Sequence, residues 1–451
     1  MQKFIAKLSE LFDRFDPKYV AFKRRAASFR YPAVTMGSLL SEPPEYGAGE
    51  AGVERENDTT PRYIRITDID ENGELLPGLG MTAARIEPQY LLRDGDLLFA
   101  RSGNTVGKCY LHDSKRVDYP CFYAGYMIRF RFDEKVLPKY VFAFAQTPYY
   151  REWVSAIQRS AGQPNINAQE YRSLELPLPP LEEQRKIVAE LDAAYAAKRA
   201  ADEKAMKLLA SIDDMVLNEL GIAKLPKPDT SLSARIFTVP ASKVANATFA
   251  PDHYFDMIDF SGSKYPCERF VERIDIDPPC GNVKITKLVP MEGVSAEWCA
   301  IENVENVAAD ATPGYSTFRG GDVIWARITP CMENGKSAVV EADPSECFCG
   351  STEFLVFRPK DDTVNPHYLQ SLLHLNRFRE VAAHHFTGTS GHQRVTADFF
   401  KSISIPIPPR PVQDRIASKA SSIRTEARKL KAEATAALEV SKQKIEKVLV
   451  I

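Results

Sequence analysis

The second half of this chain repeats the first, and this duplication constrains the fold more than any other feature of the sequence. The segment Gly95–Arg101 (GDLLFAR) matches Gly321–Arg327 (GDVIWAR) at an offset of 226 residues. The segment Leu176–Pro180 (LPLPP) matches Ile405–Pro409 (IPIPP) at an offset of 229 residues. Motifs that recur in order with a small drift in spacing are typical of a duplicated domain with altered loops. The sequence therefore predicts two copies of one module.

Within each copy, strand-like and helix-like segments are mixed. Runs such as Arg62–Ile66 and Glu353–Phe357 are rich in β-branched and aromatic residues and are bounded by glycine- and proline-marked turns, as strands are. Helical patterns follow at 138–158 and 366–385. These features predict an α+β fold class, with two tandem mixed α/β domains.

Each module ends in a segment that predicts a long helix. The proline-rich stretches at 177–180 and 406–409 cannot continue a helix, but they can start one. The segments 181–220 and 410–450 that follow contain no glycine, and proline occurs in them only at position 411. Apolar residues and alanines recur there in alternating steps of three and four, the pattern of a coiled-coil seam. The seam positions that we single out are Ile187, Leu191, Leu208, Ile212, Ile416, Ile423 and Leu430, with Ala434 and Ala437 continuing the second seam.

Charge favours pairing of the two long segments. Residues 181–220 hold six Lys and Arg against nine Asp and Glu, a net charge of −3. Residues 410–450 hold ten Lys and Arg against five Asp and Glu, a net charge of +5. Because opposite charges attract, we expect the two helices to pack on each other. Two separate surface helices remain the alternative.

These patterns divide the chain into six parts. The expected parts are an N-terminal helix at 1–14, a first mixed domain at 15–178, a central helix at 179–221, a linker at 222–233, a second mixed domain at 234–407 and a C-terminal helix at 408–451.

Composition limits the compartment and the chemistry. No run of 18 or more apolar residues occurs, and Met1–Glu10 lacks the apolar core of a secretory signal. The eight cysteines are scattered, and Cys347 and Cys349 have no second pair at zinc spacing. We therefore expect a cytoplasmic, reduced protein without a metal site or cofactor. A pI near 6.4 also means that any DNA-binding role must rest on local basic surface, since nucleic-acid-binding domains often have a pI above ~9.

Two segments superficially resemble enzyme motifs. Gly103–Cys109 is similar to a phosphate-binding loop, but that motif requires a glycine at position 102 and a serine or threonine at position 109. Asp277–Cys280 (DPPC) lacks the aromatic residue that follows the two prolines in amino-methyltransferases. Asp96 and Asp322 follow a glycine before a strand and are expected to stabilise turns. We predict that the chain has no catalytic residue.

The duplicated set as a whole resembles the specificity subunits of type I restriction-modification systems. The resemblance rests on the G-D-[LV]-[LI]-x-A-R strand, the P-L-P-P boundary and the following long helix, and it covers nearly the whole chain in both halves. It implies that each half is a target recognition domain reading one part of a split DNA sequence. It also implies that the long helices pair antiparallel and form a spacer and a docking surface for methyltransferase subunits, which we expect to number two. A restriction or translocase subunit is a further candidate partner.

Two polar clusters in each half are candidates for DNA contact, because Arg and Lys bind guanine or phosphate and Asn pairs with adenine. The scaffold-like alternative is that the shared pairs Arg101/Arg327 and Lys108/Lys336 make internal hydrogen bonds, and the residues that differ are the better candidates for reading bases. The first cluster comprises Arg101, Asn104 and Lys108, with Arg327, Thr329, Asn334 and Lys336 in the copy; the second comprises Arg159, Gln163, Asn165 and Asn167, with His392, Gln393 and Arg394 in the copy.

Two functions of different class are compatible with this sequence. The favoured one is a non-catalytic subunit that reads a bipartite, asymmetric target in double-stranded DNA. The alternative is a duplicated coiled-coil adaptor that binds protein partners without reading DNA.

Overall fold

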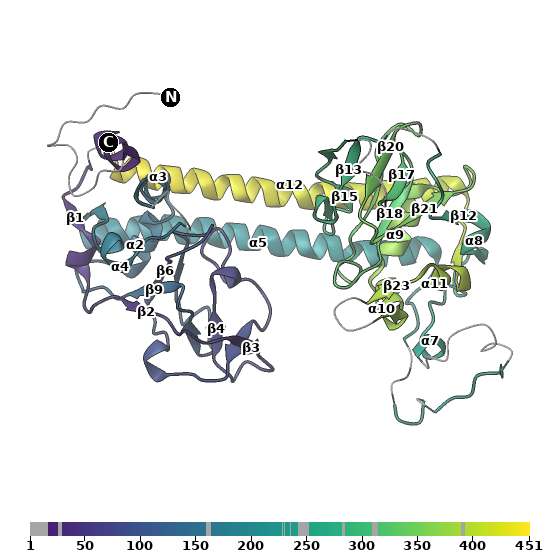
Figure 1. Ribbon diagram of the computed structural model, residues 1–451, viewed down its shortest axis with the longest axis horizontal. Helices are drawn as coiled ribbons and strands as arrows, with labels where there is room; N and C mark the ends of the chain where they lie inside the picture. The colour runs from purple at the N-terminus through teal and green to yellow at the C-terminus, as the bar shows by residue number, and fades with distance from the viewer. Residues whose placement is uncertain are drawn as a thin grey trace. The chain divides into compact units, whose positions relative to one another are not determined.

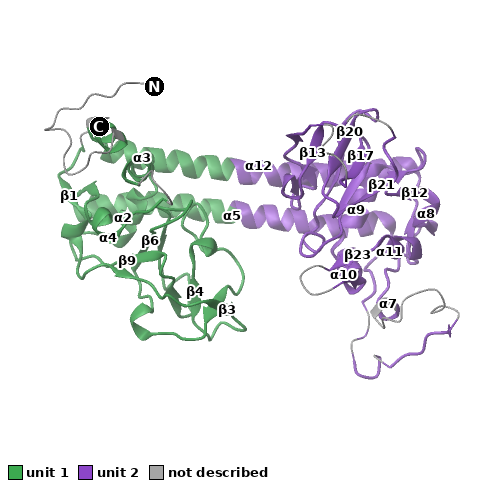
Figure 2. Cartoon of the chain, viewed as in Figure 1, with its two compact units in different colours: residues 1–200, 433–451 green, residues 201–432 purple. Residues whose placement is uncertain are grey.

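The computed structural model describes residues 17–25, 29–158, 164–227, 229, 231–234, 236–241, 252–281, 285–308, 314–388 and 393–451. The chain divides into two compact units (Figure 2), unit 1 with residues 1–200 and 433–451 and unit 2 with residues 201–432. Each unit holds one mixed domain and part of each long helix. The N-terminal helix expected at 1–14 lies outside the described residues.

The domain of unit 1 is built on two four-stranded sheets. The first has the order β2-β9-β6-β7 with antiparallel neighbours, and Figure 1 shows β9 beside β6. The second has the order β3-β5-β4-β8, in which β4 and β8 are parallel. A further antiparallel pair joins β1 to β10. The strands are β1 (Ala33–Thr35), β2 (Glu45–Tyr46), β3 (Gly52–Glu54), β4 (Arg62–Ile64), β5 (Met81–Ala83), β6 (Leu97–Ala100), β7 (Cys109–Leu111), β8 (Cys121–Tyr123), β9 (Met127–Phe130) and β10 (Glu175–Pro177).

The domain of unit 2 repeats the first sheet and the central strands of the second, but its edge strand β17 pairs with β20, whereas β3 of unit 1 pairs with β5 at the opposite edge. Its first sheet has the order β12-β21-β18-β19, and its second has the order β16-β13-β20-β17 with β13 and β20 parallel. The pair β11–β24 corresponds to β1–β10. The strands are β11 (Cys267–Arg269), β12 (Ile274–Ile276), β13 (Lys287–Val289), β14 (Val294–Ser295), β15 (Ala300–Ile301), β16 (Glu305–Asn306), β17 (Ser316–Arg319), β18 (Val323–Ala326), β19 (Ser337–Val339), β20 (Cys347–Gly350), β21 (Phe354–Pro359), β22 (Phe386–Thr387), β23 (Arg394–Val395) and β24 (Ser404–Pro406). The predicted duplication and the α+β class are confirmed.

Short helices pack against the sheets. Each of the helical stretches predicted as single segments is broken into two: α2 and α3 in unit 1, α9 and α10 in unit 2. In unit 1 the break is caused by Pro148, which cannot donate the helical hydrogen bond and instead starts α3, with Thr147 as the N-cap. The helices and 3₁₀ turns of the domains are α1 (Pro17–Arg25), η2 (Met36–Leu39), η3 (Ile66–Asp68), η4 (Pro88–Tyr90), α2 (Pro138–Phe144), α3 (Pro148–Ile157), α4 (Ala168–Arg172), α7 (Asp252–Phe255), α8 (Phe270–Arg273), η5 (Met291–Gly293), α9 (Pro366–His374), α10 (Asn376–His384) and α11 (Ala397–Ser402).

The two long helices are present where the sequence predicts them, as α5 (Leu181–Leu220) and α12 (Arg410–Leu449). A fully buried glutamine in the first turn ties each of them to its own domain. Gln184 Oε1 accepts a hydrogen bond from the backbone of Leu137 (2.8 Å), and Gln413 Oε1 accepts one from Asn365 (2.8 Å). Each side-chain amide also donates to two backbone carbonyls. Both copies therefore fix the direction of the helix in the same way.

Within each unit the parts of the two long helices pair, as their charges predict. In unit 2, Glu219 accepts hydrogen bonds from Arg415 (2.8 Å) and Lys419 (2.6 Å), while Asp213, one to two turns earlier on α5, interacts with Arg424, farther along α12. This opposite order of partners makes the pairing antiparallel. In unit 1, Lys444 of α12 forms an ion pair with Glu190 of α5 (2.7 Å).

The long helices also complete the domain cores, and this alters the expected seam. Ile187, Leu191, Ile212 and Ile416 are buried in the hydrophobic cores, and Ile423 packs against the core of unit 2. Leu208 and Leu430 are only partly buried and do not appear among the core residues. Ala434 is partly buried, but the continuation to Ala437 is wrong: Ala437 is exposed, and the buried residues there are Leu438, Ile445 and Leu449. These larger side chains reach the core of the unit 1 domain, so burial follows the domain as well as the partner helix.

Candidate nucleic-acid interface

In unit 1 the two polar clusters predicted from the sequence meet. The turn after β6 forms a bridge to the segment before α4, between Ser102 and Asn165. The backbone of Gly103 donates to Pro164 O (3.0 Å), and that of Ile166 donates to Arg101 O (2.8 Å). Side chains of both clusters therefore belong to one local surface.

Unit 2 carries the same arrangement with different side chains. Ile328 forms the bridge to Arg394, and the backbone of Thr329 donates to Gln393 O (3.1 Å). The backbone of Val395 donates to Arg327 O (2.9 Å). Arg394 therefore occupies the position that Asn165 has in unit 1.

The two shared lysines are used inside their domains. Lys108 Nζ donates to Ile69 O (3.0 Å) and pairs with Glu71 (2.8 Å). Lys336 Nζ donates to Met291 O (2.8 Å). In both units the lysine thereby ties the turn after a central strand to a 3₁₀ turn earlier in the chain. This is the internal hydrogen bonding that the sequence leaves open as the alternative to DNA contact.

The two shared arginines have different surroundings. The Arg101 guanidinium lies over the ring of Tyr46, 4.8 Å from its centroid, and no ion pair of Arg101 is found in the part of the chain that the structure describes. Arg327 Nε lies 3.6 Å from a carboxylate oxygen of Glu353, too far for a good hydrogen bond. Glu353 is hydrogen-bonded instead by Arg394, through Nε (2.8 Å) and Nη2 (2.6 Å). These hydrogen bonds hold the pKa of the Glu353 carboxyl below its usual range.

The remaining candidate residues divide into three groups. Asn167 caps α4, accepting a hydrogen bond from the backbone of Glu170 (2.9 Å), and Thr329 Oγ1 donates to Glu333 (2.7 Å). Asn104 and Asn334 are exposed in their turns, and Gln393 is partly buried. Arg159, Gln163 and His392 lie outside the described residues.

Three residues of this surface were missed by the sequence reasoning. Tyr46 and Tyr126 are both exposed, Tyr126 at 66%, and Glu353 forms ion pairs with Arg327 and Arg394. Comparing the two halves strand by strand, rather than motif by motif, would have flagged Glu353 and Tyr126. They stand immediately before equivalent strands, β21 and β9, and differ in charge.

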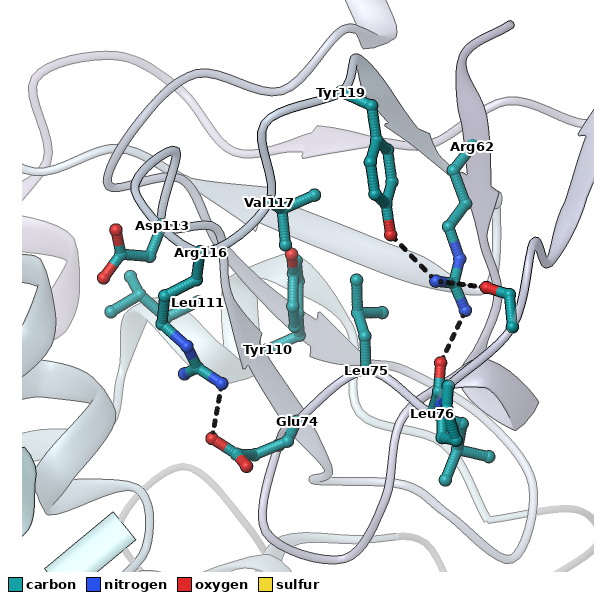
Figure 3. Close-up of a pocket in the computed structure, with 13 residues that line it drawn as sticks. Arg62, Glu74, Leu75, Leu76, Tyr110, Leu111, Asp113, Arg116, Val117 and Tyr119 are labelled. Atoms are coloured by element: carbon teal, nitrogen blue, oxygen red, sulfur yellow. Dashed lines mark hydrogen bonds and ion pairs between the residues drawn. The ribbon is translucent and has the colours of Figure 1, made fainter. Parts of the chain in front are cut away.

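Of two cavities in unit 1, one shares residues with this surface and the other does not. One of about 230 Å³ (Figure 3) is lined by the buried Arg62, which donates to the Tyr119 hydroxyl (3.0 Å) and to Leu76 O (2.9 Å). Across it Arg116 pairs with Glu74 (2.7 Å). Arg62, Arg116 and Glu74 are thus already hydrogen-bonded within the domain, and none of the predicted DNA-contact residues lines this cavity. A second cavity, of about 300 Å³, includes Asn104 and Lys108 in its wall.

No helix among the described residues is long and apolar enough to cross a membrane. Across the same residues, no group of three or more His, Cys, Asp or Glu side chains is placed to hold a metal ion.

A family model decides the relationship that the motifs suggest. The model of the type I restriction modification DNA specificity domain matches residues 56–205 and 281–439, together more than half of the chain. The chain belongs to this family of specificity domains. One matched range lies in each half of the sequence, so both copies of the duplicated module carry the specificity-domain pattern.

Curated relatives of this specificity-domain chain are specificity subunits of Escherichia coli. The type I restriction enzyme EcoAI specificity subunit is 32% identical over 140 residues, which cover 31% of this chain and 24% of that protein. The EcoEI specificity subunit is 28% identical over 162 residues, covering 36% and 27%. The EcoKI specificity subunit of strain K12 is 26% identical over 222 residues, covering 48% and 45%. Each match thus spans less than half of the relative's own length.

Solved structures of type I systems are similar over most of the chain. A chain from a study of complex assembly and conformational transition of the type I R-M system covers 93% of this chain and 98% of its own, with a TM-score of 0.49 and 16% identity. The HsdS subunit from Thermoanaerobacter tengcongensis covers 92% and 95%, with a TM-score of 0.34 and 19% identity. Such scores are too low to establish a shared fold, so the topology rests on the strand pairing described above.

Proposed function

We propose that this chain is the DNA sequence-specificity subunit of a type I restriction-modification complex, reading a bipartite, asymmetric target. The observation that carries the proposal is that two copies of one specificity domain differ at equivalent surface positions. Asn165 in unit 1 corresponds to Arg394 in unit 2, in the same backbone bridge. Asn pairs well with adenine and Arg with guanine, so two such surfaces read different half-sites.

The same surfaces supply the two kinds of contact that sequence reading requires. Contacts to phosphates set the position of a protein on the duplex, and contacts to base edges set the sequence. Arg101 and Asn165 in unit 1, with Arg327 and Arg394 in unit 2, are the described residues that we assign to the duplex. The other predicted contact residues at these turns, Asn104, Asn334 and Gln393, supplement them. We assign Lys108 and Lys336 to holding the turns in place.

Partner subunits supply the chemistry in this proposal. Residues 15–178 and 234–407 act as the two target recognition domains, and the helices at 179–221 and 408–451 act as spacer and docking surface. Two methyltransferase subunits bind there with their own methyl donor, and a restriction or translocase subunit joins where cleavage occurs. This chain contributes no catalytic group. The family relationship favours this role over the adaptor that binds protein partners without reading DNA.

Methylome sequencing of the host tests the function directly. Deleting the gene should abolish methylation at one split, asymmetric motif, and restoring the full chain should bring it back, because the partners lack their own sequence recognition. The complex is purified from the same strains to show that the partners are still made. Methylation that continues unchanged without this chain would exclude the specificity role and favour the adaptor.

The spacer role predicts a change in the distance between half-sites. Removing one heptad from each long helix at facing positions shortens the helix pair by about 10 Å, since a helix rises about 1.5 Å per residue. The non-specific part of the target should shorten by about three base pairs, at about 3.4 Å each, while both half-sites keep their sequence. Removing the heptad from only one helix misaligns the pair and should abolish methylation. A double-helix deletion that leaves the spacing unaltered would contradict the spacer role.

A further inference from the structure

Glu353 and Tyr126 occupy the same position in the two copies of the fold. The backbone of Arg327 donates to Glu353 O (2.9 Å), and the backbone of Arg101 donates to Tyr126 O (2.9 Å). Each residue immediately precedes the strand that pairs with the central strand of its first sheet. The two positions are therefore directly comparable, and one carries a carboxylate where the other carries an exposed phenol.

In unit 2 the carboxylate of Glu353 lies between two arginines. Arg394 is hydrogen-bonded to it through two nitrogens, and Arg327 is paired with it at 3.6 Å. The side chains are 20% exposed for Glu353 and 33% for each arginine, so the cluster is partly open to solvent. Arg327 Nε is buried without a hydrogen-bond partner. The carboxylate thus restricts both guanidinium groups from one side.

Among the described residues of this surface, unit 1 orients Arg101 without an acid. Arg101 lies over the Tyr46 ring, and the positions of Arg394 and Glu353 are held by the neutral Asn165 and Tyr126. The two guanidinium groups and one carboxylate give this cluster of unit 2 a net charge of +1, the same charge that Arg101 carries among the described residues at the equivalent positions of unit 1. The second arginine of unit 2 is therefore accompanied by a compensating acid at the position equivalent to Tyr126.

We propose that Glu353 is a positioning residue for DNA recognition by unit 2, orienting Arg327 and Arg394 toward base edges and weakening their attraction to phosphates. This inference rests on the proposed DNA-reading function. A guanidinium reads guanine through two parallel hydrogen bonds, which require a fixed plane. An unrestrained arginine instead binds any phosphate, which raises affinity without adding sequence preference. A partly exposed carboxylate beside both guanidinium groups therefore disfavours their binding to phosphates and favours their hydrogen bonding to guanine.

The test uses the full chain co-expressed with the proteins encoded beside its gene. Sequences are selected from a pool of random-sequence duplexes, and the affinity for the unselected pool is measured over a series of salt concentrations. The central variant is Glu353→Gln, which keeps the size and a hydrogen-bond acceptor but removes the charge. Tyr126→Glu is the matched variant in unit 1, because it places a carboxylate beside Arg101.

Glu353→Gln should raise affinity for the unselected pool roughly tenfold near about 0.1 M salt and steepen the log–log salt dependence by about one unit, as one more neutralised phosphate would. The half-site read by unit 2 should lose preference at one or two base pairs, while the other half-site is unchanged. Tyr126→Glu should lower affinity for the pool by a similar factor. Adding Arg394→Asn to Glu353→Gln restores the net charge and should return the salt dependence to that of the unaltered chain.

Each outcome separates this inference from the proposed function. An unaltered complex that selects no sequence would overturn the proposed function, and this inference with it. An unaltered complex that selects a split motif, with a Glu353→Gln variant that keeps the same motif and salt dependence, would overturn the role of Glu353 alone. Weaker binding of Glu353→Gln to the pool would overturn it too, since removal of a repulsive charge cannot have that effect. Thermal unfolding of each variant confirms that the units remain folded.

Discussion

Asp322→Ala should destabilise unit 2 by about 3–5 kcal/mol, the usual cost of removing one partner of a buried ion pair. The Asp322 carboxylate is 1% exposed, and both of its oxygens accept hydrogen bonds from Arg358, at 2.7 Å each. One of them also accepts from the backbone of Arg319 (2.8 Å). The substitution leaves a largely enclosed guanidinium and a backbone N–H without their acceptor.

The first copy of the domain provides a graded control. Asp96 pairs with Arg131 in the same way, but Arg131 is also hydrogen-bonded to Glu42 (2.6 Å). Asp96→Ala should therefore cost unit 1 less than Asp322→Ala costs unit 2, because Glu42 still neutralises the arginine. Hydrogen exchange of the amides in β18 and β19, compared with those in β6 and β7, assigns each loss of stability to its unit. A single unfolding curve of a two-unit chain does not separate the two losses. Equal losses in both units would show that Glu42 contributes nothing.

Unit 2 should lose stability in acid, and His374→Gln should remove much of this loss. Burial, together with the nearby charges of Arg379 and Arg424, lowers the pKa of His374 to about 3. A histidine in an unfolded chain titrates near pH 6.5, so between about pH 6.5 and pH 3 the unfolded state binds the extra proton. The stability that comes from the neutral ring is thus complete above pH 6.5 and falls as the pH drops below it. At about 1.4 kcal/mol per pH unit, acidification to about pH 4 costs up to about 3 kcal/mol.

Glutamine is the matched replacement because the equivalent position in unit 1 holds a glutamine, Gln146. Gln146 lies just after α2, and His374 is the last residue of α9, the corresponding helix of unit 2. The glutamine amide keeps a donor for the Gly335 carbonyl, which the His374 ring contacts, and does not titrate. The effect is measured by urea unfolding between about pH 7 and pH 4. Hydrogen exchange of the backbone amides in α9 and β19 reports the stability of unit 2. The variant should show a flatter pH profile for unit 2 and an unaltered one for unit 1. Parallel profiles for the variant and the unaltered chain would assign the acid sensitivity to other groups.

The candidate surface could be predicted only in part. Motif matching located both turns in each half, and the shared identity of Lys108 and Lys336 correctly raised the alternative of an internal role. It did not reveal that each lysine reaches a backbone carbonyl about 40 residues earlier in the chain, at Ile69 and Met291. Nor did it reveal that Glu353 lies between Arg327 and Arg394. Such contacts depend on which strands become neighbours, and spacing along the chain carries no information about that.

The sequence by itself determined the duplication, the α+β class and the extent of the two long helices. These features rest on local signals: repeated motifs, prolines that start helices, and about 40 residues without glycine. Only the tertiary structure decided which helix residues are buried and which arginines form ion pairs with an acid. Leu438 is buried in place of the expected Ala437, and Ile445 and Leu449 are buried farther along, because the unit 1 domain covers that part of α12. Burial and charge pairing are properties of neighbours in space, which a period of three and four residues does not specify.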